Sequence, residues 1–307
     1  MTHVTRLAPS PTGALHLGNA RTFLATWAMA RQRGWRIVLR VEDLDGPRIK
    51  PEFSQQAIND LTWLGLDWDS GPTLQTPRLA VYRAAIERLI ASGHAYPCVC
   101  TRKEIEQAAS APHAEDGSAV YPGTCRGKFQ DAADALARTG RPPAWRFAVP
   151  DMLFEFRDDF AGVCRFDLAT QIGDFVLAKP DDTPSYQLAV VADDLDAGVT
   201  QVVRGDDLID SVPRQVLLYN ALGRDAETPA YTHLPLVLGP DGRRLAKRHG
   251  DTRLGSLRDD GWSADRVRGL LGKWLGLGKD TTLTPQQVLD RFDLARVPRE
   301  PVVATPL

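Results

Sequence analysis

The sequence lacks any long run of apolar residues, although 43% of its 307 residues are hydrophobic. No stretch reaches the roughly 18–20 apolar residues that a membrane-spanning helix requires, so we expect no membrane partner. A basic segment followed by an apolar run is also missing after Met1, which makes the cytoplasm the expected compartment. With 25% charged residues, the composition is typical of a folded globular chain rather than a disordered one.

The sequence also lacks an excess of charge and is poor in cysteine. Its 37 Lys and Arg residues and 39 Asp and Glu residues give a net charge of −2. A protein that coats nucleic acid would be strongly basic, so that class is excluded, whereas a local basic track is not. Four cysteines are too few for a disulfide scaffold and more typical of thiols or metal ligands.

Strand-like and helix-like stretches alternate in the first part of the chain. Residues 4–8 and 35–41 predict strands, and residues 18–32, 51–64 and 77–91 predict helices. This order predicts an α/β fold with a parallel sheet.

The pattern changes at residues 93–150, which contain three of the cysteines and a polar stretch without periodicity, and we interpret them as an insertion with its own small fold. Further segments follow: strands at 145–149, 175–178, 199–204 and 232–238, and helices at 212–222, 264–275 and 285–292.

A turn rich in Pro and Gly joins the first strand to the first helix at residues 6–19, Arg-Leu-Ala-Pro-Ser-Pro-Thr-Gly-Ala-Leu-His-Leu-Gly-Asn. The N-terminus of a helix offers unpaired N–H groups and a positive dipole end to a phosphate. Gly18 has no Cβ, so a base or ribose can lie against its backbone, and His16 stands where its ring can donate to a phosphate oxygen. Taken alone, a His-x-Gly motif would more often only cap the helix.

This stretch resembles the signature of class I aminoacyl-tRNA synthetases, in the form found in glutamyl- and glutaminyl-type enzymes, with Asn19 in place of the second His. A basic run at residues 243–249, Arg-Arg-Leu-Ala-Lys-Arg-His, resembles the Lys-Met-Ser-Lys-Ser loop of the same class. Cations there can neutralise charge as pyrophosphate leaves, although such a run alone is usually solvated surface. Ala246 and Arg248 replace the two serines. The resemblance implies catalytic roles for His16 and Lys247, and an ATP site made of His16, Gly18, Asn19, Arg244 and Lys247.

Charged residues at strand ends predict a site for an amino acid. Glu42 and Asp43 follow the second strand at its carboxyl end, where ligands of parallel sheets bind, and a carboxylate there can hold an ammonium group. Arg6 and Arg204 end two other strands, and an arginine fork grips a carboxylate with two hydrogen bonds. Each residue taken alone would more often form an ordinary salt bridge.

Two further segments, Pro-Ser-Tyr-Gln-Leu-Ala at residues 184–189 and Arg-Gly-Asp-Asp-Leu at residues 204–208, resemble glutamyl-type synthetases. A cationic clamp favours glutamate over glutamine, because a neutral amide leaves the guanidinium without its counter-charge. Which arginine dominates stays open, and the two acids of the second segment can also cap the following helix. The resemblance implies that glutamate is held by Arg6, Ser10, Glu42, Tyr186 and Arg204.

Three clustered cysteines, Cys98, Cys100 and Cys125, supply most of a tetrahedral structural zinc site. The fourth ligand is open from ligand chemistry alone; the candidates are His113, Cys164 and Asp116. Cys164 is better interpreted as a half-buried small hydrophobe. Cys-x-Cys followed by Tyr-x-x-x-Cys resembles the zinc pattern of glutamyl-queuosine tRNA(Asp) synthetases, which implies Tyr121 as the fourth ligand. Three reduced, unligated thiols are the alternative.

The resemblance covers nearly the whole chain and implies a class I synthetase fold: a Rossmann-like parallel sheet, a small zinc-binding insertion and a short helical C-terminal segment. The expected parts are 1–92, the first half of the catalytic domain; 93–185, the inserted connective subdomain; 186–238, the second half; and 239–307, the basic loop and closing helices. Glutamyl-tRNA synthetases carry a helical anticodon-binding region after the loop, and too few residues follow Gly250 to form one.

With the cysteine pattern, this resemblance implies a ligase of the glutamyl-queuosine tRNA(Asp) synthetase family. Such enzymes activate L-glutamate with ATP and transfer it to queuosine at the wobble position of tRNA(Asp). The expected partners are L-glutamate, ATP with Mg²⁺, and queuosine-containing tRNA(Asp), with one structural Zn²⁺. The alternatives are a truncated glutamyl-tRNA synthetase charging a tRNA 3′ end, a small-molecule nucleotidyltransferase and a non-catalytic RNA-binding relic.

Overall fold

The computed structural model describes residues 2–11, 14–44, 51–108, 120–243, 245 and 252–304. Strands and helices alternate in its first part, in the order β1 (Val4–Leu7), α1 (Leu17–Gln32), β2 (Arg36–Val41), α2 (Pro51–Trp63), β3 (Ser70–Leu74) and α3 (Leu79–Ala91). The three strands form a parallel sheet in the order β1-β2-β3. The predicted elements of this part are confirmed. Strand β3 was not predicted, because its Gly and Pro are typical of turns; a Cβ at Gly71 would lie 2.2 Å from Leu39 O.

A second parallel pair continues the fold beside the first. Helix α6 (Tyr186–Ala197) leads into β9 (Gln201–Gly205), and α7 (Ser211–Ala221) joins β9 to its parallel neighbour β10 (Ala230–Leu234). Strand β9 runs next to β1, where Thr200 N donates to Val4 O at 2.9 Å. The predicted single strand at 232–238 is wrong: Pro235 has no N–H to donate, and the chain divides into β10 and β11 (Val237–Leu238).

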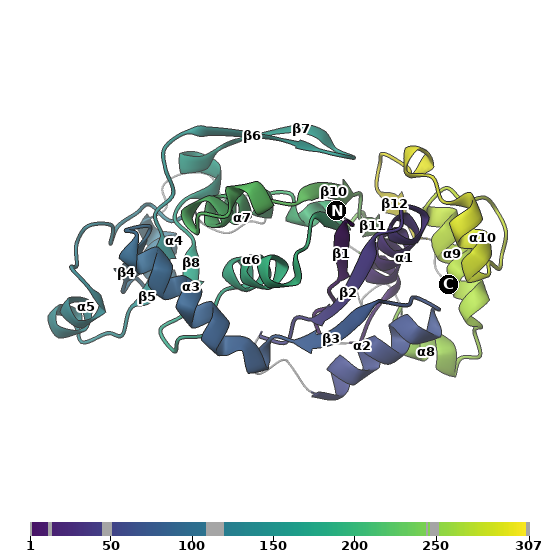
Figure 1. Cartoon of the computed structure of the whole chain (residues 1–307), viewed down its shortest axis with the longest axis horizontal. Helices are drawn as coiled ribbons and strands as arrows, with labels where there is room; N and C mark the ends of the chain where they lie inside the picture. The colour runs from purple at the N-terminus through teal and green to yellow at the C-terminus, as the bar shows by residue number, and fades with distance from the viewer. Residues whose placement is uncertain are drawn as a thin grey trace.

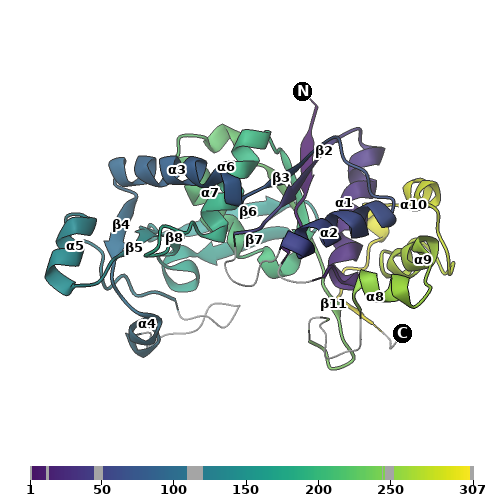
Figure 2. The same ribbon diagram turned by 90° about the horizontal axis from the view of Figure 1, so that it is seen from below.

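The predicted insertion contains a small antiparallel sheet, in the order β4-β5-β8. Its elements are β4 (Ala95–Cys98), α4 (Arg102–Ala108), α5 (Ala132–Thr139), β5 (Ala144–Phe147) and β8 (Val176–Ala178). A separate antiparallel hairpin consists of β6 (Leu153–Asp158) and β7 (Gly162–Asp167). Figures 1 and 2 place the small sheet at one end of the elongated molecule and the closing helices at the other.

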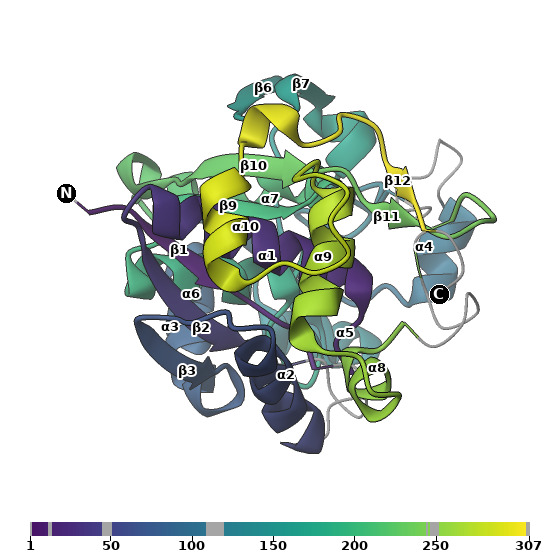
Figure 3. The same cartoon turned by 90° about the vertical axis from the view of Figure 1, so that its right-hand side faces the viewer.

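The closing helices α8 (Leu254–Asp259), α9 (Ala264–Trp274) and α10 (Pro285–Arg291) lie on the α1 side of the molecule, as Figure 3 shows. Strand β12 (Val302–Val303) then pairs with β11. Arg21 of α1 is fully buried, and its guanidinium donates to Trp274 O at 3.2 Å and to Pro235 O at 2.6 Å. These bonds fix the closing helices and the β10–β11 link to one helix.

Helix α1 lies at the centre of the larger hydrophobic core. Many of its residues are alanines, such as Ala20, Ala25 and Ala28, which are fully buried, so that strands and helices can approach it closely from several sides. A second core lies between α3, α6, α7 and the small sheet. Among the described residues, no helix combines the length and apolar character needed to cross a membrane.

Candidate functional site

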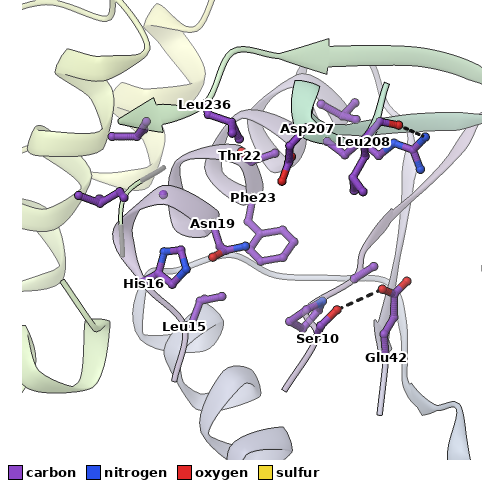
Figure 4. Close-up of a pocket in the computed structure, with 18 of the residues that line it drawn as sticks. Ser10, Leu15, His16, Asn19, Thr22, Phe23, Glu42, Asp207, Leu208 and Leu236 are labelled. Atoms are coloured by element: carbon purple, nitrogen blue, oxygen red, sulfur yellow. Dashed lines mark hydrogen bonds between the residues drawn. The ribbon is translucent and has the colours of Figure 1, made fainter. Parts of the chain in front are cut away.

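A cavity of about 730 Å³ opens at the carboxyl ends of β1 and β9 and at the start of α1 (Figure 4). This position matches the rule that parallel sheets bind ligands beyond the carboxyl ends of their strands. The lining includes every described residue predicted to bind ATP or glutamate: Arg6, Ser10, His16, Gly18, Asn19, Glu42, Tyr186 and Arg204. Segments nearly 200 positions apart in the sequence therefore meet at one site. Arg244 and Lys247 lie outside the described residues.

The signature turn presents His16 at the N-cap of α1. Its backbone is extended, with φ −118° and ψ 164°, and its side chain makes no capping hydrogen bond to the helix. His16 therefore occupies the N-cap position, but its side chain does not cap the helix. A Cβ at Gly18 would lie 3.4 Å from His16 Nδ1, so the glycine leaves room for the imidazole ring. At this helix end the N–H of Leu17 is bonded to Thr252 O at 3.0 Å, while Gly18 and Asn19 of the first turn line the cavity, where N–H groups of a helix start can face a phosphate.

Described residues within and after the basic run are held by backbone hydrogen bonds near the cavity. Leu245 is buried, lines the cavity and donates its N–H to Val237 O at 3.0 Å. On the other side, Thr252 O accepts from Leu17 N at 3.0 Å, and Arg253 forms a β-bridge with His16. Leu245 within the run thus lines the cavity, and the chain that follows the run passes beside the start of α1.

Glu42 lies on the opposite side of the cavity, where it accepts a hydrogen bond from Ser10 Oγ at 3.3 Å (Figure 4). Arg40 Nη2 lies 3.2 Å from Glu42 Oε1. Burial raises the pKa of Glu42, while the cations of Arg40 and Arg6 oppose this shift. Asp43, the other predicted carboxylate, does not line the cavity; it accepts from the backbone N–H groups of residues 75 and 76 and fixes that turn.

A buried network of ion pairs connects Arg6 and Arg40 to helix α6. Arg40 Nη1 lies 2.6 Å from Asp194 Oδ1, and Arg6 Nε lies 3.8 Å from the same oxygen. Both arginines are almost fully buried. The sequence analysis missed Asp194 and the neighbouring Asp193; the available signal was a pair of acids directly after the apolar run 188–192 of helix α6, which is typical of buried, paired carboxylates.

Arg204 is the penultimate residue of β9 and is 5% exposed. Its guanidinium donates three hydrogen bonds: Nε to His233 Nε2 at 2.9 Å, Nη1 to Gln215 Oε1 at 3.1 Å and Nη2 to Leu208 O at 3.0 Å. The guanidinium also lies over the Tyr231 ring, 5.4 Å from its centroid. All three acceptors are neutral or weakly basic, so this buried cation is held without a direct carboxylate partner among the described residues. The sequence analysis missed His233 and Gln215, which follow Arg204 by 29 and 11 positions.

The three cysteines form a compact cluster with Tyr121. Their sulfurs lie within 4.8 Å of one another, with Cys100 Sγ 3.4 Å from Cys125 Sγ. Tyr121 Oη lies 3.3 Å from Cys98 Sγ and 3.5 Å from Cys100 Sγ. A tetrahedral zinc with bonds of about 2.3 Å places its sulfurs about 3.8 Å apart, so the donor set fits this ion. Burial raises the pKa of Cys100 to about 12, and it also raises the pKa of Tyr121. Metal ligation by these two groups therefore requires a cation that favours their deprotonated forms.

Arg146 supplies positive charge next to this cluster. Its Nε donates to Cys98 Sγ at 3.3 Å, and its guanidinium lies 3.9 Å above the centroid of the Tyr121 ring. Cys164 lies on β7, half-buried against the second hydrophobic core, which confirms its interpretation as a small hydrophobe. His113 and Asp116 lie outside the described residues.

Comparison with known proteins decides the family. The family described as tRNA synthetases class I (E and Q), catalytic domain, matches residues 3–281. A glutamyl-Q tRNA(Asp) synthetase of Symbiobacterium thermophilum is 50% identical over 97% of this chain and 94% of its own length. The chain belongs to the glutamyl-Q tRNA(Asp) synthetase family. A second member, from Rhodopirellula baltica, is 48% identical over 98% of this chain and 96% of its own length.

A solved structure agrees with this family assignment at the level of the fold. The crystal structure of a glutamate tRNA ligase from Elizabethkingia meningosepticum, in complex with its amino acid, superposes with a TM-score of 0.83 and 27% identity. The match covers 100% of this chain and 68% of the longer chain of that ligase. The family thus confirms the class I α/β fold and separates the chain from small-molecule nucleotidyltransferases.

Proposed function

We propose that this protein activates L-glutamate with ATP and transfers the glutamyl group to queuosine at the wobble position of tRNA(Asp). The observation that carries the proposal is a single cavity in which the start of α1 and the buried, uncompensated cation of Arg204 face the same space. The helix end suits the phosphates of ATP, and the cation suits the side-chain carboxylate of glutamate.

In the activation step, an oxygen of the glutamate α-carboxylate attacks the α-phosphorus of ATP. The bond from that phosphorus to the bridging oxygen breaks, and pyrophosphate leaves with the electron pair. His16 donates to a phosphate oxygen, the N–H groups at the start of α1 face the nucleotide, and Lys247 neutralises charge that develops on the leaving pyrophosphate. Mg²⁺, when bound with ATP, compensates further phosphate charge.

In the transfer step, a hydroxyl of the queuosine cyclopentene-diol attacks the carbonyl carbon of the glutamyl-adenylate. The hydroxyl loses its proton, an ester bond forms, and AMP leaves with the electrons of the broken mixed-anhydride bond. The cavity residues hold the glutamyl part in place during both steps, which converts a bimolecular encounter into a positioned reaction.

For amino-acid recognition, we propose that Arg204 reads the side-chain carboxylate. A guanidinium has five N–H donors, and three of those on Arg204 are used within the protein. One donor on each Nη is left without a partner among the described residues, and guanidinium donors are well suited to a carboxylate. Arg6 is already near Asp194, so its charge is partly compensated; it supports the site, while Glu42 and Tyr186 hold the α-ammonium end.

For the metal, we propose that Cys98, Cys100, Cys125 and Tyr121 hold one structural zinc. The donor spacing described above supports this proposal, and Arg146 offsets part of the negative charge that three thiolates would bring. When bound, the ion would connect β4 to the loop that contains Tyr121 and Cys125, so its expected effect is on the stability of the small sheet.

The proposed activity predicts glutamate-dependent ATP–pyrophosphate exchange by the purified protein in the absence of tRNA, and transfer of labelled glutamate to tRNA(Asp) that carries queuosine. The same tRNA with unmodified guanosine at the wobble position should accept none, because it lacks the diol. A control excludes the tRNA 3′ end as the acceptor. The queuosine diol is first protected by glutamylation, the 3′-terminal ribose is then oxidised with periodate, and the protecting ester is hydrolysed. The resulting tRNA should still accept glutamate at the modified base. Charging of unmodified tRNA at its 3′ end would instead identify a truncated glutamyl-tRNA synthetase.

The metal proposal predicts about one zinc per chain by elemental analysis. Cys125→Ser should lose most of it and lower the melting temperature, because structural zinc contributes directly to folding. Cys164→Ser is the matched control, since Cys164 lies outside the cluster, and it should keep the zinc. Tyr121→Phe tests the fourth ligand by itself: zinc affinity equal to that of the wild type would remove the hydroxyl from the ligand set.

A further inference from the structure

A chain of three side chains extends from the glutamate cavity into the core. In the parallel pair β9–β10, His233 stands directly opposite Arg204. His233 Nε2 accepts the hydrogen bond from Arg204 Nε at 2.9 Å, and His233 Nδ1 lies 2.6 Å from Asp158 Oδ2 at the end of β6. Both His233 and Asp158 have fully buried side chains. Neither residue lines the cavity.

These contacts allow one protonation state of the imidazole. A guanidinium donates only, so His233 Nε2 must be the acceptor, and the single proton of the neutral ring lies on Nδ1, where it is donated to Asp158. A protonated ring would direct an N–H at the N–H of Arg204. Burial lowers the pKa of His233, and the cation of Arg204 lowers it further against the opposing effect of Asp158.

Asp158 is itself fixed by the backbone. Its Oδ1 accepts from the N–H groups of Phe160 at 2.9 Å, Ala161 at 2.7 Å and His233 at 3.1 Å. One oxygen therefore organises the turn after β6, and the other faces the imidazole. The carboxylate can hold the histidine in one orientation and one tautomer.

We infer that His233 and Asp158 are positioning residues for Arg204, and that they set the selectivity for glutamate. This inference rests on the proposed role of Arg204 in reading the substrate carboxylate. A carboxylate bound directly to Arg204 would orient it equally well but would neutralise it and compete with the substrate. The neutral imidazole, placed between the two charges, fixes Arg204 Nε while its two remaining donors keep their full attraction for an anion.

Asp158→Asn is the sharpest test because the change is nearly isosteric. The amide oxygen can still accept the backbone N–H groups, while the amide NH₂ can only donate to His233 Nδ1. The imidazole must then carry its proton on Nε2, facing Arg204 Nε–H. A wrong tautomer of this kind disables a histidine without moving it. We expect the KM for glutamate in ATP–pyrophosphate exchange to rise about 10- to 100-fold, with the KM for ATP within about twofold of wild type.

Asp159→Asn is the matched control, since the adjacent Asp159 is exposed, and it should leave both KM values unchanged. His233→Gln keeps a neutral acceptor for Arg204 Nε and should recover a KM for glutamate within about threefold of wild type, whereas His233→Leu should resemble Asp158→Asn. A purely structural role would lower stability and kcat in Asp158→Asn and His233→Leu without separating the KM for glutamate from the KM for ATP.

The tautomer can also be measured directly in the wild-type protein, with His233→Gln used only to assign the signal. In protein labelled with ¹⁵N-histidine, the signal that disappears in His233→Gln should show a neutral ring with its proton on Nδ1. A proton on Nε2, or on both nitrogens, would overturn the inference, and so would an unchanged KM for glutamate in folded Asp158→Asn. Wild-type protein without glutamate-dependent exchange would contradict the proposed function instead.

Discussion

Arg204→Gln is expected to lower kcat/KM for glutamate in ATP–pyrophosphate exchange by about 10³-fold, since truncating one partner of a buried charge pair typically costs several kcal/mol. The introduced glutamine side chain can still form neutral hydrogen bonds with its surroundings. It carries no positive charge, however, and so cannot replace the cation that we propose binds the substrate carboxylate. Discrimination against glutamine should be on the order of 10⁴-fold in the wild type, and it should fall steeply in this variant. The KM for ATP should change little, because the start of α1 is untouched.

The matched control is Arg224→Gln, which makes the same chemical change at a partly exposed arginine after α7, where the side chain pairs with Glu227 and does not line the cavity. It should keep wild-type activity and selectivity. If Arg204→Gln retained activity within tenfold of wild type while Arg6→Gln lost it, the carboxylate would be read by Arg6, and the argument from charge compensation would be wrong. Equal activation of glutamine and glutamate by the wild type would contradict a cationic clamp at either position.

The parts of this site that could be predicted from sequence are those carried by short contiguous segments. The turn before α1 combines a strand end, a Pro- and Gly-rich turn and a helix start, so its residues indicate both a local structure and a phosphate site. Arg6, Glu42 and Arg204 each stand at the end of a recognisable buried strand. Parallel packing brings such ends to one edge of a sheet, which is why the structure places them around a single cavity.

The supporting residues could not be predicted, because their partners are distant in sequence and their types are ambiguous. Asp194 pairs with Arg40, 154 positions earlier, and Asp158 pairs with His233, 75 positions later. Before the fold is known, each is an ordinary acid or histidine. Asp43 shows the converse: it follows a strand at the expected edge, yet its carboxylate binds a backbone turn and faces away from the cavity. The position of a residue at a strand end predicts that it lies at the ligand-binding edge of the sheet. Whether it lines the cavity depends on the direction of its side chain, which the sequence pattern does not give.

Lys247→Ala is expected to lower the rate of glutamate activation by about 10²- to 10³-fold, because a cation aimed at developing phosphate charge acts mainly in the transition state. The expectation comes from the resemblance of residues 243–249 to the Lys-Met-Ser-Lys-Ser loop and from the neighbours of that run. Leu245 lines the cavity, and Thr252 binds the backbone at the start of α1. The effect should appear in kcat, with the KM for glutamate changed far less, since Arg204 and Glu42, which we propose bind the amino acid, lie outside the loop.

Single-turnover formation of glutamyl-adenylate measures this step more directly than steady-state exchange. Lys247→Arg keeps the charge and should recover much of the rate, whereas Lys247→Met keeps the length without the charge and should resemble the alanine variant. Lys273→Ala, at an exposed position of α9, is the matched control and should behave as wild type. Near-normal adenylate formation by both Lys247→Ala and Lys247→Met would remove this lysine from the chemistry, and the neighbouring Arg244 would then be the cation to test, because it occupies the position of the first lysine of the loop.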